Sequence, residues 1–501
     1  MSAPADLGAL APLWIVVLAA LAVLSLTVTG GPKRPAPASS GHLTILSLVA
    51  IGTAALLLWG VTGNRTLFSG AVVIDGISVL FGLTALTAAF LGIILSAAYL
   101  KEHGLSHGEY FALIMLSSVG MLMVAMAGDL LTLFIGVETM SLAVYILAGF
   151  RRASRRSQEA AMKYFIYGAF ASAFLLFGIG LLYGEVGRLT GMPALGFQAL
   201  GTAFFGKEVS LLGCIGVTMV LGGLGFKVAA VPFHMWAPDV YEGAPTPSTG
   251  FMAVGIKAAA VAGICRFVAA TMLSGGERGT ETAIQILEVM AILTMVTGNV
   301  LAVRQTQLKR MLAYSSIAHA GYVLVGIAAF LADPRSIAIE AIAYYLFGYT
   351  AMTLGAFGVI LAFERGDDRR QDLPIDRLAG VAHRYPALGL AMALFMFSLA
   401  GVPPTAGFFG KLAIFGAAVA AGRTSVVIVA VLASAIGAYY YLKVTVVMYM
   451  RASGTEEKRV ESAWLSAGLW LCAALTLVAG VLPESYFAFA RRMLAGWLGQ
   501  A

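Results

Sequence analysis

The chain alternates between long apolar runs and short polar segments. A helix of about 20 mainly apolar residues is long enough to cross a hydrocarbon core of about 30 Å. The pattern therefore predicts an all-α, polytopic membrane protein with about fourteen transmembrane helices. The predicted spans cover residues 10–28, 43–61, 77–100, 110–127, 129–150, 160–184, 209–230, 249–273, 283–303, 311–331, 337–363, 386–421, 425–450 and 463–482.

Two predicted spans contain helix-breaking proline. Pro232 follows Lys227 near the end of span seven, and Pro403-Pro404 interrupts span twelve, which is too long for a single crossing. Proline removes a backbone donor and crowds the preceding turn, so each helix must kink or unwind. Broken helices in two halves of a chain are typical of inverted-repeat transporters. Because the two breaks are five spans apart, an odd number, we expect spans four to eight and nine to thirteen to form two inverted repeats.

These repeats divide the chain into four expected segments. They are an N-terminal three-helix segment at residues 1–100, a first antiporter-like repeat at 101–275, a second, inverted repeat at 276–455, and a C-terminal transmembrane helix with a tail at 456–501.

The composition supports a protein that lies almost wholly in the membrane. Of its 501 residues, 60% are hydrophobic and 11% are charged, whereas a soluble domain has about 25% charged residues. The net charge of +7 agrees with Lys and Arg in cytoplasmic loops and does not point to nucleic acid. With the N-terminus outside, the expected inside loops hold most Lys and Arg residues, so we expect both termini on the outer side.

The sequence contains no recognisable redox or nucleotide motif. Cys214, Cys265 and Cys472 lie inside apolar runs and form neither a CxxC pair nor a Cys/His cluster. Neither a GxGxxG fingerprint after a strand nor a P-loop occurs. We therefore expect no metal, haem, iron–sulfur cluster or nucleotide in this chain.

Glu138 lies near the middle of an apolar run at residues 130–150. At 1.5 Å per residue it is about 13 Å from the polar edge at Asp129, close to the membrane midplane. A carboxylate at that depth costs at least a few kcal/mol and marks a functional site by default.

Three lysines also lie inside predicted spans. Lys257 is about 12 Å inside span eight, and Lys227 and Lys411 accompany the two breaks. Lys227 could instead snorkel from a helix end, and the other two could belong to structural ion pairs. Burial disfavours the charged form of these groups and a nearby opposite charge favours it. A row of Glu138 with the three lysines would therefore suit a proton relay.

Other polar residues could bridge the gaps in this row. His234 follows the first break and His319 lies inside span ten; each could be a structural, hydrogen-bonded residue or a relay group with an ordinary pKa of about 6.5. Lys163 is four residues after Glu159, which favours an ion pair within one helix.

Two further sets of polar residues are expected to lie outside the row. Asp75, Arg266 and Lys443 lie near span edges, where a structural or a snorkelling role is expected. Tyr439-Tyr440-Tyr441 is expected to pack or to anchor the helix at the interface.

Four segments of the chain combine these buried charges and helix breaks. They are GDLLTLFIGVETMSLAVYILAGF (128–150), FKVAAVPFHMWAPDVYEGAPTPSTGFMAVGIKAA (226–259), LKRMLAYSSIAHAGYVLVG (308–326) and LAGVPPTAGFFGKLAIF (399–415). Together they resemble the antiporter-like subunits of respiratory complex I. EGAPTP at 242–247 and Lys411 make the resemblance greatest to the subunit N group of the bacterial NADH–quinone oxidoreductases.

The resemblance implies a proton-translocating membrane-arm subunit that is coupled to quinone reduction elsewhere. It implies that NADH, FMN, iron–sulfur clusters and quinone bind partner subunits, that neighbouring antiporter-like and small membrane subunits are partners in the bilayer, and that the location is a bacterial cytoplasmic membrane. By matching positions it implies a proton pathway of Glu138, Lys227, Lys257 and Lys411, with Lys163, His234 and His319 as auxiliary residues.

Two alternatives use the same residues. The chain could belong to a cation/proton antiporter complex, or to a membrane-bound hydrogenase complex. The set of partner chains would distinguish these cases from an NADH–quinone oxidoreductase.

Overall fold

The computed structural model describes residues 7–29, 40–61, 63–105, 107–273, 276–364, 373–452 and 459–497. Within these ranges most residues are helical, and the only sheet is a two-stranded antiparallel hairpin of β1 (Arg65–Leu67) and β2 (Val72–Ile74). The predicted all-α class is therefore confirmed, with one small hairpin that the apolar pattern did not reveal.

Thirteen helices in the described ranges are long and apolar enough to cross a membrane. Two shorter apolar helices, α17 (Pro386–Ala400) and α18 (Ala406–Ala420), together supply one further crossing, which gives the fourteen that the sequence predicts. The others are α2 (Ala11–Thr29), α3 (Ser40–Trp59), α4 (Gly76–Glu102), α5 (His107–Ala125), α6 (Leu130–Ala148), α7 (Arg155–Thr190), α9 (Leu211–Val228), α11 to α12 (Thr246–Thr271), α13 (Gly276–Val303), α14 (Leu308–Ala332), α15 (Ala338–Leu361), α19 (Thr424–Met450) and α20 (Ala463–Val481).

Short helices connect or flank the spans. They are η1 (Phe68–Gly70), α8 (Phe197–Phe204), α10 (Trp236–Gly243), η4 (Ile375–Leu378), α16 (Val381–Arg384) and α21 (Pro483–Leu494).

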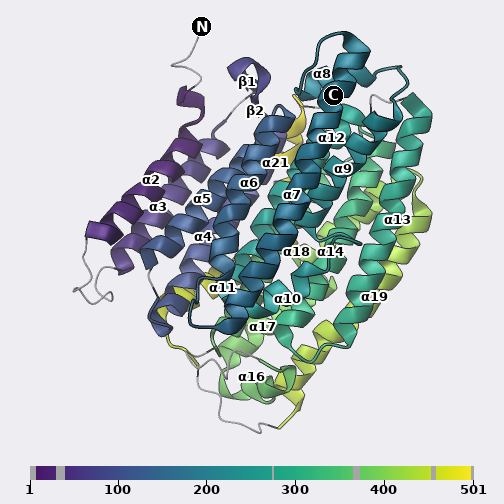
Figure 1. Cartoon of the computed structure of the whole chain (residues 1–501). Helices are drawn as coiled ribbons and strands as arrows, with labels where there is room; N and C mark the ends of the chain where they lie inside the picture. Colours follow the sequence, from purple (N-terminus) through teal and green to yellow (C-terminus); the bar gives the residue numbers. More distant parts are fainter. Residues whose placement is uncertain are drawn as a thin grey trace.

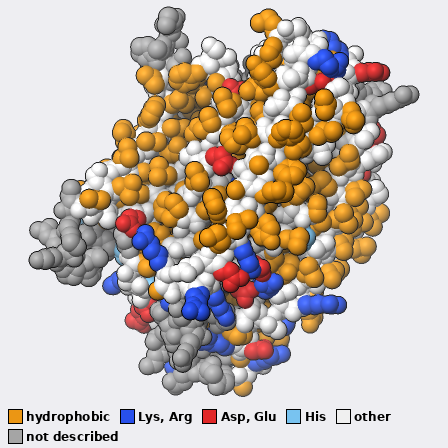
Figure 2. All heavy atoms as spheres, in the orientation of Figure 1, with side chains coloured by type: hydrophobic (Ala, Val, Ile, Leu, Met, Phe, Trp, Pro, Cys, Tyr) orange, Lys and Arg blue, Asp and Glu red, His pale blue; other side chains and the backbone are white. Residues whose placement is uncertain are grey.

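The spans form a bundle of roughly aligned helices (Figure 1). In Figure 1, α2 and α3 lie at one side and α13 and α19 at the other. The helices α11, α12, α14 and α15 are buried almost throughout. The start of α2 and the C-terminal α21 lie at the same end, as an even number of crossings requires. Figure 2 shows apolar side chains over the middle of one face and most of the charged side chains near its ends. The protein is therefore an integral, multi-pass membrane protein.

The first predicted break is present at the end of α9. This helix ends at Val228, Ala229 adopts a left-handed conformation with φ 59°, and the Val231–Pro232 peptide is cis. The chain then enters α10. Proline cannot continue the hydrogen-bonding pattern of α9, so the break occurs where the sequence predicts it.

The second break has a similar form. α17 ends at Ala400, Gly401 has φ +92°, and the Pro403–Pro404 peptide is cis before α18 begins. A positive φ favours glycine because glycine has no Cβ. Both predicted breaks are confirmed. The division into two inverted repeats stays a prediction, and its boundaries near residues 275 and 455 fall at or beside the gaps in the described ranges.

The span that carries Lys257 contains a feature without a sequence signal. α11 (Thr246–Phe251) passes into a π-helical turn at Met252–Ile256, and α12 (Lys257–Thr271) begins directly after it. A π turn widens the helix locally and often occurs at functional sites. It therefore helps to set the direction in which Lys257 leaves the helix.

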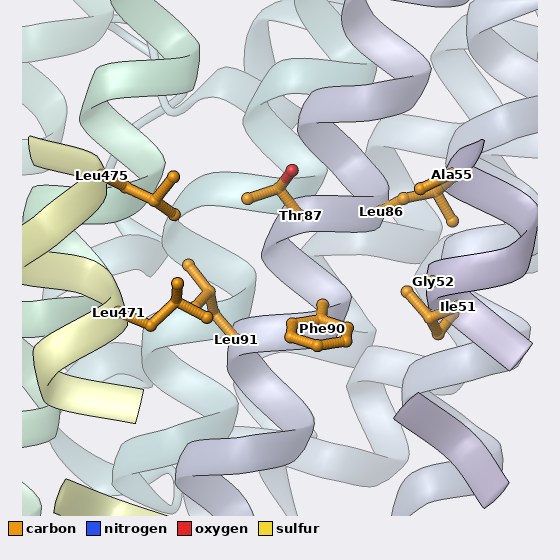
Figure 3. Close-up of a pocket in the computed structure, with 9 residues that line it drawn as sticks. All are labelled: Ile51, Gly52, Ala55, Leu86, Thr87, Phe90, Leu91, Leu471 and Leu475. Carbon is orange, nitrogen blue, oxygen red and sulfur yellow. The ribbon is translucent and has the colours of Figure 1, made fainter. Parts of the chain in front are cut away.

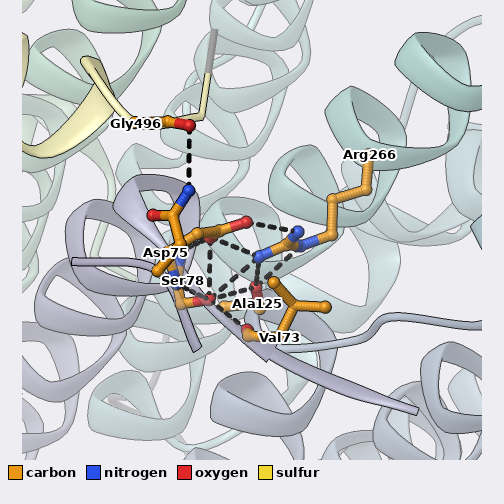
Figure 4. Close-up of polar contacts among 7 residues, drawn as sticks. Val73, Asp75, Ser78, Ala125, Arg266 and Gly496 are labelled. Carbon is orange, nitrogen blue, oxygen red and sulfur yellow. Dashed lines mark hydrogen bonds and ion pairs between the residues drawn. The ribbon is translucent and has the colours of Figure 1, made fainter. Parts of the chain in front are cut away.

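An ion pair fixes α12 to α4 at the other end of the same span (Figure 4). Arg266 donates to both carboxylate oxygens of Asp75, at 2.6 and 2.9 Å, and also to the Ala125 carbonyl. Asp75 also caps α4 by accepting from the Ser78 backbone N–H at 2.9 Å. Both charges are buried and well satisfied, so of the two roles expected from the sequence the structural one is found and snorkelling is not.

Candidate functional site

Glu138 lies at the lateral edge of the predicted row. It is half-buried on α6, and the Ser172 hydroxyl of α7 donates a hydrogen bond to its carboxylate. Ile135 and Leu142, on the same helix, are exposed. The carboxylate is therefore close to the outer surface of the bundle, and a serine from the neighbouring helix orients it.

Lys227 is buried at the end of α9, which rules out a snorkelling side chain. Its ammonium donates to the Ser141 hydroxyl at 2.8 Å and to the Tyr145 hydroxyl at 3.1 Å. Among the described residues it forms no ion pair, so Glu138 acts on it electrostatically without a direct contact. Ser141, which contacts Lys227, lies one helical turn after Glu138 on α6. It is therefore the residue through which α6 connects the carboxylate to the lysine.

Lys257 is also buried without an acidic partner in the described ranges. Its ammonium donates to the carbonyl and the hydroxyl of Ser316 on α14, at 2.5 and 2.7 Å. It lies over the ring of Tyr349 on α15, 5.6 Å from the centroid. These ligands are all neutral, so the alternative of a structural ion pair is wrong for Lys257.

Lys411 receives its ligands from the second helix break. Its ammonium donates to the carbonyls of Leu399 and Ala400, at 2.9 and 3.0 Å, and to the Ser434 hydroxyl at 2.9 Å. The last carbonyls of a helix have no partner within it, so the break leaves acceptors free for the ammonium. The ammonium also lies 5.1 Å from the centroid of Tyr322. In the described ranges Lys411 likewise has no acidic partner.

His319 lies between these two lysines on α14. Its Nδ1 is hydrogen-bonded to the Tyr345 hydroxyl, and its Nε2 to the Tyr441 hydroxyl at 2.9 Å. Its ring centroid is 4.9 Å from that of Tyr349 and 5.6 Å from that of Tyr322. The same two tyrosines lie beneath Lys257 and Lys411. The structure therefore brings Lys257, Tyr349, His319, Tyr322 and Lys411 into one continuous series.

The sequence did not identify the tyrosines of this series, because a tyrosine in an apolar run has no signal that separates it from a core residue. Tyr441, which was expected to pack or to anchor the helix, is buried and packed, and its hydroxyl in addition contacts His319. Tyr164 was also missed. It is stacked on Trp236 and meets the edge of Tyr145, beside Lys227.

The structure places the other predicted residues away from the centre of the row. Lys163 forms the expected pair with Glu159 at 2.8 Å and a second pair with Asp239 of α10 at 2.9 Å. His234 is half-buried between α9 and α10, and its Nδ1 has no hydrogen-bond partner.

Asp239 is a further residue that the sequence did not single out. It pairs with Lys163 of α7 and with Arg310 of α14, each at 2.9 Å. Partial burial acts to raise the pKa of Asp239, but the hydrogen bonds from the two cations outweigh it and hold the pKa below its usual range. These two ion pairs hold α10, the short helix after the first break, to α7 on one side and to α14 on the other.

Two other features do not contribute to this site. In the described ranges no three His, Cys, Asp or Glu residues are grouped so that they could hold a metal ion. A pocket of about 150 Å³ lies between α3, α4 and α20, and its lining, which includes Phe90, Leu91 and Leu471, is almost wholly apolar (Figure 3). None of the row residues line it.

Comparisons with known proteins identify the family of this chain. A family model described as NADH:quinone oxidoreductase/Mrp antiporter, TM, matches residues 127–437. NADH-quinone oxidoreductase subunit N of Trichlorobacter lovleyi is 43% identical, over 91% of this chain and 91% of that protein. A chain of respiratory complex I from Thermus thermophilus is 32% identical with a TM-score of 0.77, over 95% of this chain and 98% of that one.

A chain of the Mrp complex from a Dietzia species is 21% identical with a TM-score of 0.81, over 98% of each chain, and shares the fold alone. Because the identity to the first relative is high over most of both chains, the relationship extends beyond the fold. The chain belongs to the NADH:quinone oxidoreductase/Mrp antiporter family and, within it, to the relatives named NADH-quinone oxidoreductase subunit N.

Proposed function

We propose that this chain translocates protons as a membrane-arm subunit of an NADH–quinone oxidoreductase. The observation that carries the proposal is the row of three buried lysines, which are 3%, 2% and 7% exposed at positions 227, 257 and 411 and have no acidic contact among the described residues. An ammonium in such a site is costly. Its charge therefore depends strongly on hydration and on its neighbours, as a relay requires.

The order of the contacts suggests the order of transfer. Glu138 and Lys227 act as the input pair through Ser141, and Lys257 hands the proton on. His319 links Lys257 to Lys411, which serves the exit half. Lys163 and His234 act as auxiliary residues near the first break. Each transfer is a proton exchange between neighbouring groups or the water between them.

The two breaks support two half-channels. We propose a first repeat of α5, α6, α7, α9 and α11–α12, and a second, inverted repeat of α13, α14, α15, α17–α18 and α19. Each repeat then contributes one broken helix and one lysine beside its break. The four-segment division at residues 1–100, 101–275, 276–455 and 456–501 follows from this arrangement.

The name of the relatives, NADH-quinone oxidoreductase subunit N, suggests which other subunits this chain assembles with. We propose that NADH, FMN, iron–sulfur clusters and quinone bind other subunits, and that the complex is a proton-translocating oxidoreductase of the translocase class. The neighbours would be antiporter-like and small membrane subunits in a bacterial cytoplasmic membrane, with both termini on the outer side. Purification from native membranes should recover NADH-binding subunits. Recovery of small antiporter or hydrogenase subunits alone would favour one of the alternatives.

The test of the pathway uses the intact complex in vesicles. Lys257→Ala and Lys411→Ala should each lower proton pumping relative to electron transfer, provided that the complex assembles. Full pumping by both variants would overturn the proposed function. The exposed, surface-paired Arg451 provides a matched control, since Arg451→Ala removes a cation outside the row.

A further inference from the structure

A cluster of buried polar groups lies at the end of α4, away from the lysine row. The rings of Tyr99 and His103 are stacked with centroids 3.9 Å apart. The Tyr99 hydroxyl is buried without a hydrogen-bond partner, and so is Nε2 of His103. Glu364, three residues after the end of α15, is 5% exposed, and its Oε2 also lacks a partner. Glu364 acts electrostatically on both rings, as does Arg151.

Polar groups continue from this cluster into the bundle. Tyr110 of α5 is within electrostatic range of Tyr99 and Glu364. Its hydroxyl is hydrogen-bonded to the Ser248 hydroxyl of α11 at 2.7 Å. Thr246, two residues earlier on α11, has a buried hydroxyl without a partner. These groups extend the polar cluster from α4 to the span that carries Lys257.

The part of the cluster nearest to Lys257 lies between α11 and α15. The close packing of these helices is shown by Gly250, where an added Cβ would be only 3.0 Å from the Leu354 side chain. Thr353, beside Leu354, has a buried hydroxyl without a partner. It lies one turn from Tyr349 and close to its hydroxyl, and the Tyr349 ring contacts Lys257. We call the set Glu364, His103, Tyr99, Tyr110, Thr246, Ser248 and Thr353 the polar seam.

The unpaired atoms of the seam require an explanation. A buried polar group without a hydrogen bond costs about 1–3 kcal/mol, and native proteins keep few of them. Five such atoms, one each on Tyr99, His103, Glu364, Thr246 and Thr353, belong to the polar seam. Arg151 lies near the Tyr99 hydroxyl and Tyr349 near that of Thr353. Buried water normally satisfies such groups, with about three hydrogen bonds per molecule. A line of water between hydroxyls and a carboxylate can conduct protons.

We propose that the polar seam is a hydrated proton-entry path that delivers protons to Lys257 independently of Glu138 and Lys227. Glu364 collects a proton from bulk water, and the proton passes along water held by the seam hydroxyls to the neutral amine of Lys257. One proton enters Glu364 for each proton that leaves it, so the seam returns to its starting state. The inference rests on the proposed function, because it takes Lys257 as the acceptor.

The test compares Glu364→Gln, Tyr110→Phe and Thr353→Val in the intact complex in vesicles. Each variant keeps the side-chain shape and removes one acid or hydroxyl of the seam. We expect each to lower proton pumping per NADH oxidised, towards the loss seen for Lys257→Ala, and Glu364→Asp to restore it. Tyr344→Phe is the matched control, since its buried hydroxyl bonds the Ala479 carbonyl outside the seam, and it should pump normally.

A second measurement distinguishes a proton-carrying role of Glu364 from a purely structural one. If Glu364 carries the proton, its carboxyl band in the infrared difference spectrum should change during turnover and vanish in Glu364→Gln. Normal pumping by all three assembled seam variants, with pumping lost in Lys257→Ala, would overturn the seam and leave the proposed function intact. Full pumping by Lys257→Ala alone would remove the acceptor of the seam and overturn it, whereas full pumping by both Lys257→Ala and Lys411→Ala would overturn the proposed function itself. A loss that Glu364→Asp does not restore would show a structural role and also overturn the seam.

Discussion

The ammonium of Lys411 is hydrogen-bonded to the carbonyl of Ala400, 3.0 Å away, across the second helix break. Ala400 is the last residue of α17, so its carbonyl has no partner within that helix. The break therefore has a chemical consequence as well as a geometric one, because it provides neutral ligands to a lysine at membrane depth. Unwound backbone survives at such depth only where it is buried in protein or lines a cavity.

Gly401→Ala should disturb this site. The residue has φ +92°, and an added Cβ would lie 3.3 Å from Lys411 Cδ and 3.4 Å from Nζ. We expect a loss of about 1–3 kcal/mol from the backbone conformation alone, together with reduced pumping. Gly422→Ala is the control, since it has φ +78° and nothing within 4 Å. Both variants should melt earlier in thermal unfolding. Equal pumping by the two would contradict a role for the close approach to Lys411.

Tyr441→Phe should weaken the link through His319. It removes the hydroxyl that is hydrogen-bonded to His319 Nε2 at 2.9 Å and keeps the ring. One hydrogen bond contributes about 0.5–1.5 kcal/mol to stability, so the complex should assemble while its pumping falls. The neighbouring Tyr440→Phe removes a hydroxyl that bonds Asn299 at 3.0 Å. The ratio of pumping to electron transfer should fall more for Tyr441→Phe, and the reverse order would count against the His319 link.

Arg266→Met should destabilise the protein strongly. It leaves the buried carboxylate of Asp75 without its cation, which costs about 3–5 kcal/mol in comparable sites. Adding Asp75→Asn should recover part of the loss, because the charge is removed and asparagine still caps α4. Thermal unfolding of the single and double variants in detergent measures the coupling. Strictly additive effects would show that the two residues do not act as a pair.

Asp239 should make the attachment of α10 sensitive to acid. Its pKa in the folded protein is below the usual range, so its ionised form stabilises the fold. That contribution is complete above the unfolded pKa of about 3.9 and is lost as the pH falls through the folded value. Because the pair is partly exposed, the contribution is at most about 1 kcal/mol.

Asp239→Asn should therefore melt slightly earlier than the parent at neutral pH and show a flatter decline of stability below about pH 5. Asp376→Asn, which removes one partner of an exposed pair with Arg451, is the control and should follow the parent curve. A decline for Asp239→Asn as steep as that of the parent would assign the acid sensitivity to other groups.

The membrane spans, the two breaks and the positions of Glu138 and the three lysines could be predicted from the order of the amino acids. These features are local, because the length of an apolar run, a proline and a charge inside the run each act within one helix. The surroundings of the lysines, in contrast, could not be predicted and are known from the fold. Lys257 finds its ligands on Ser316, 59 residues away, and His319 meets Tyr441, 122 residues away. Such contacts depend on how separate helices pack, and a tyrosine or serine in an apolar run carries no mark of which neighbour it will face.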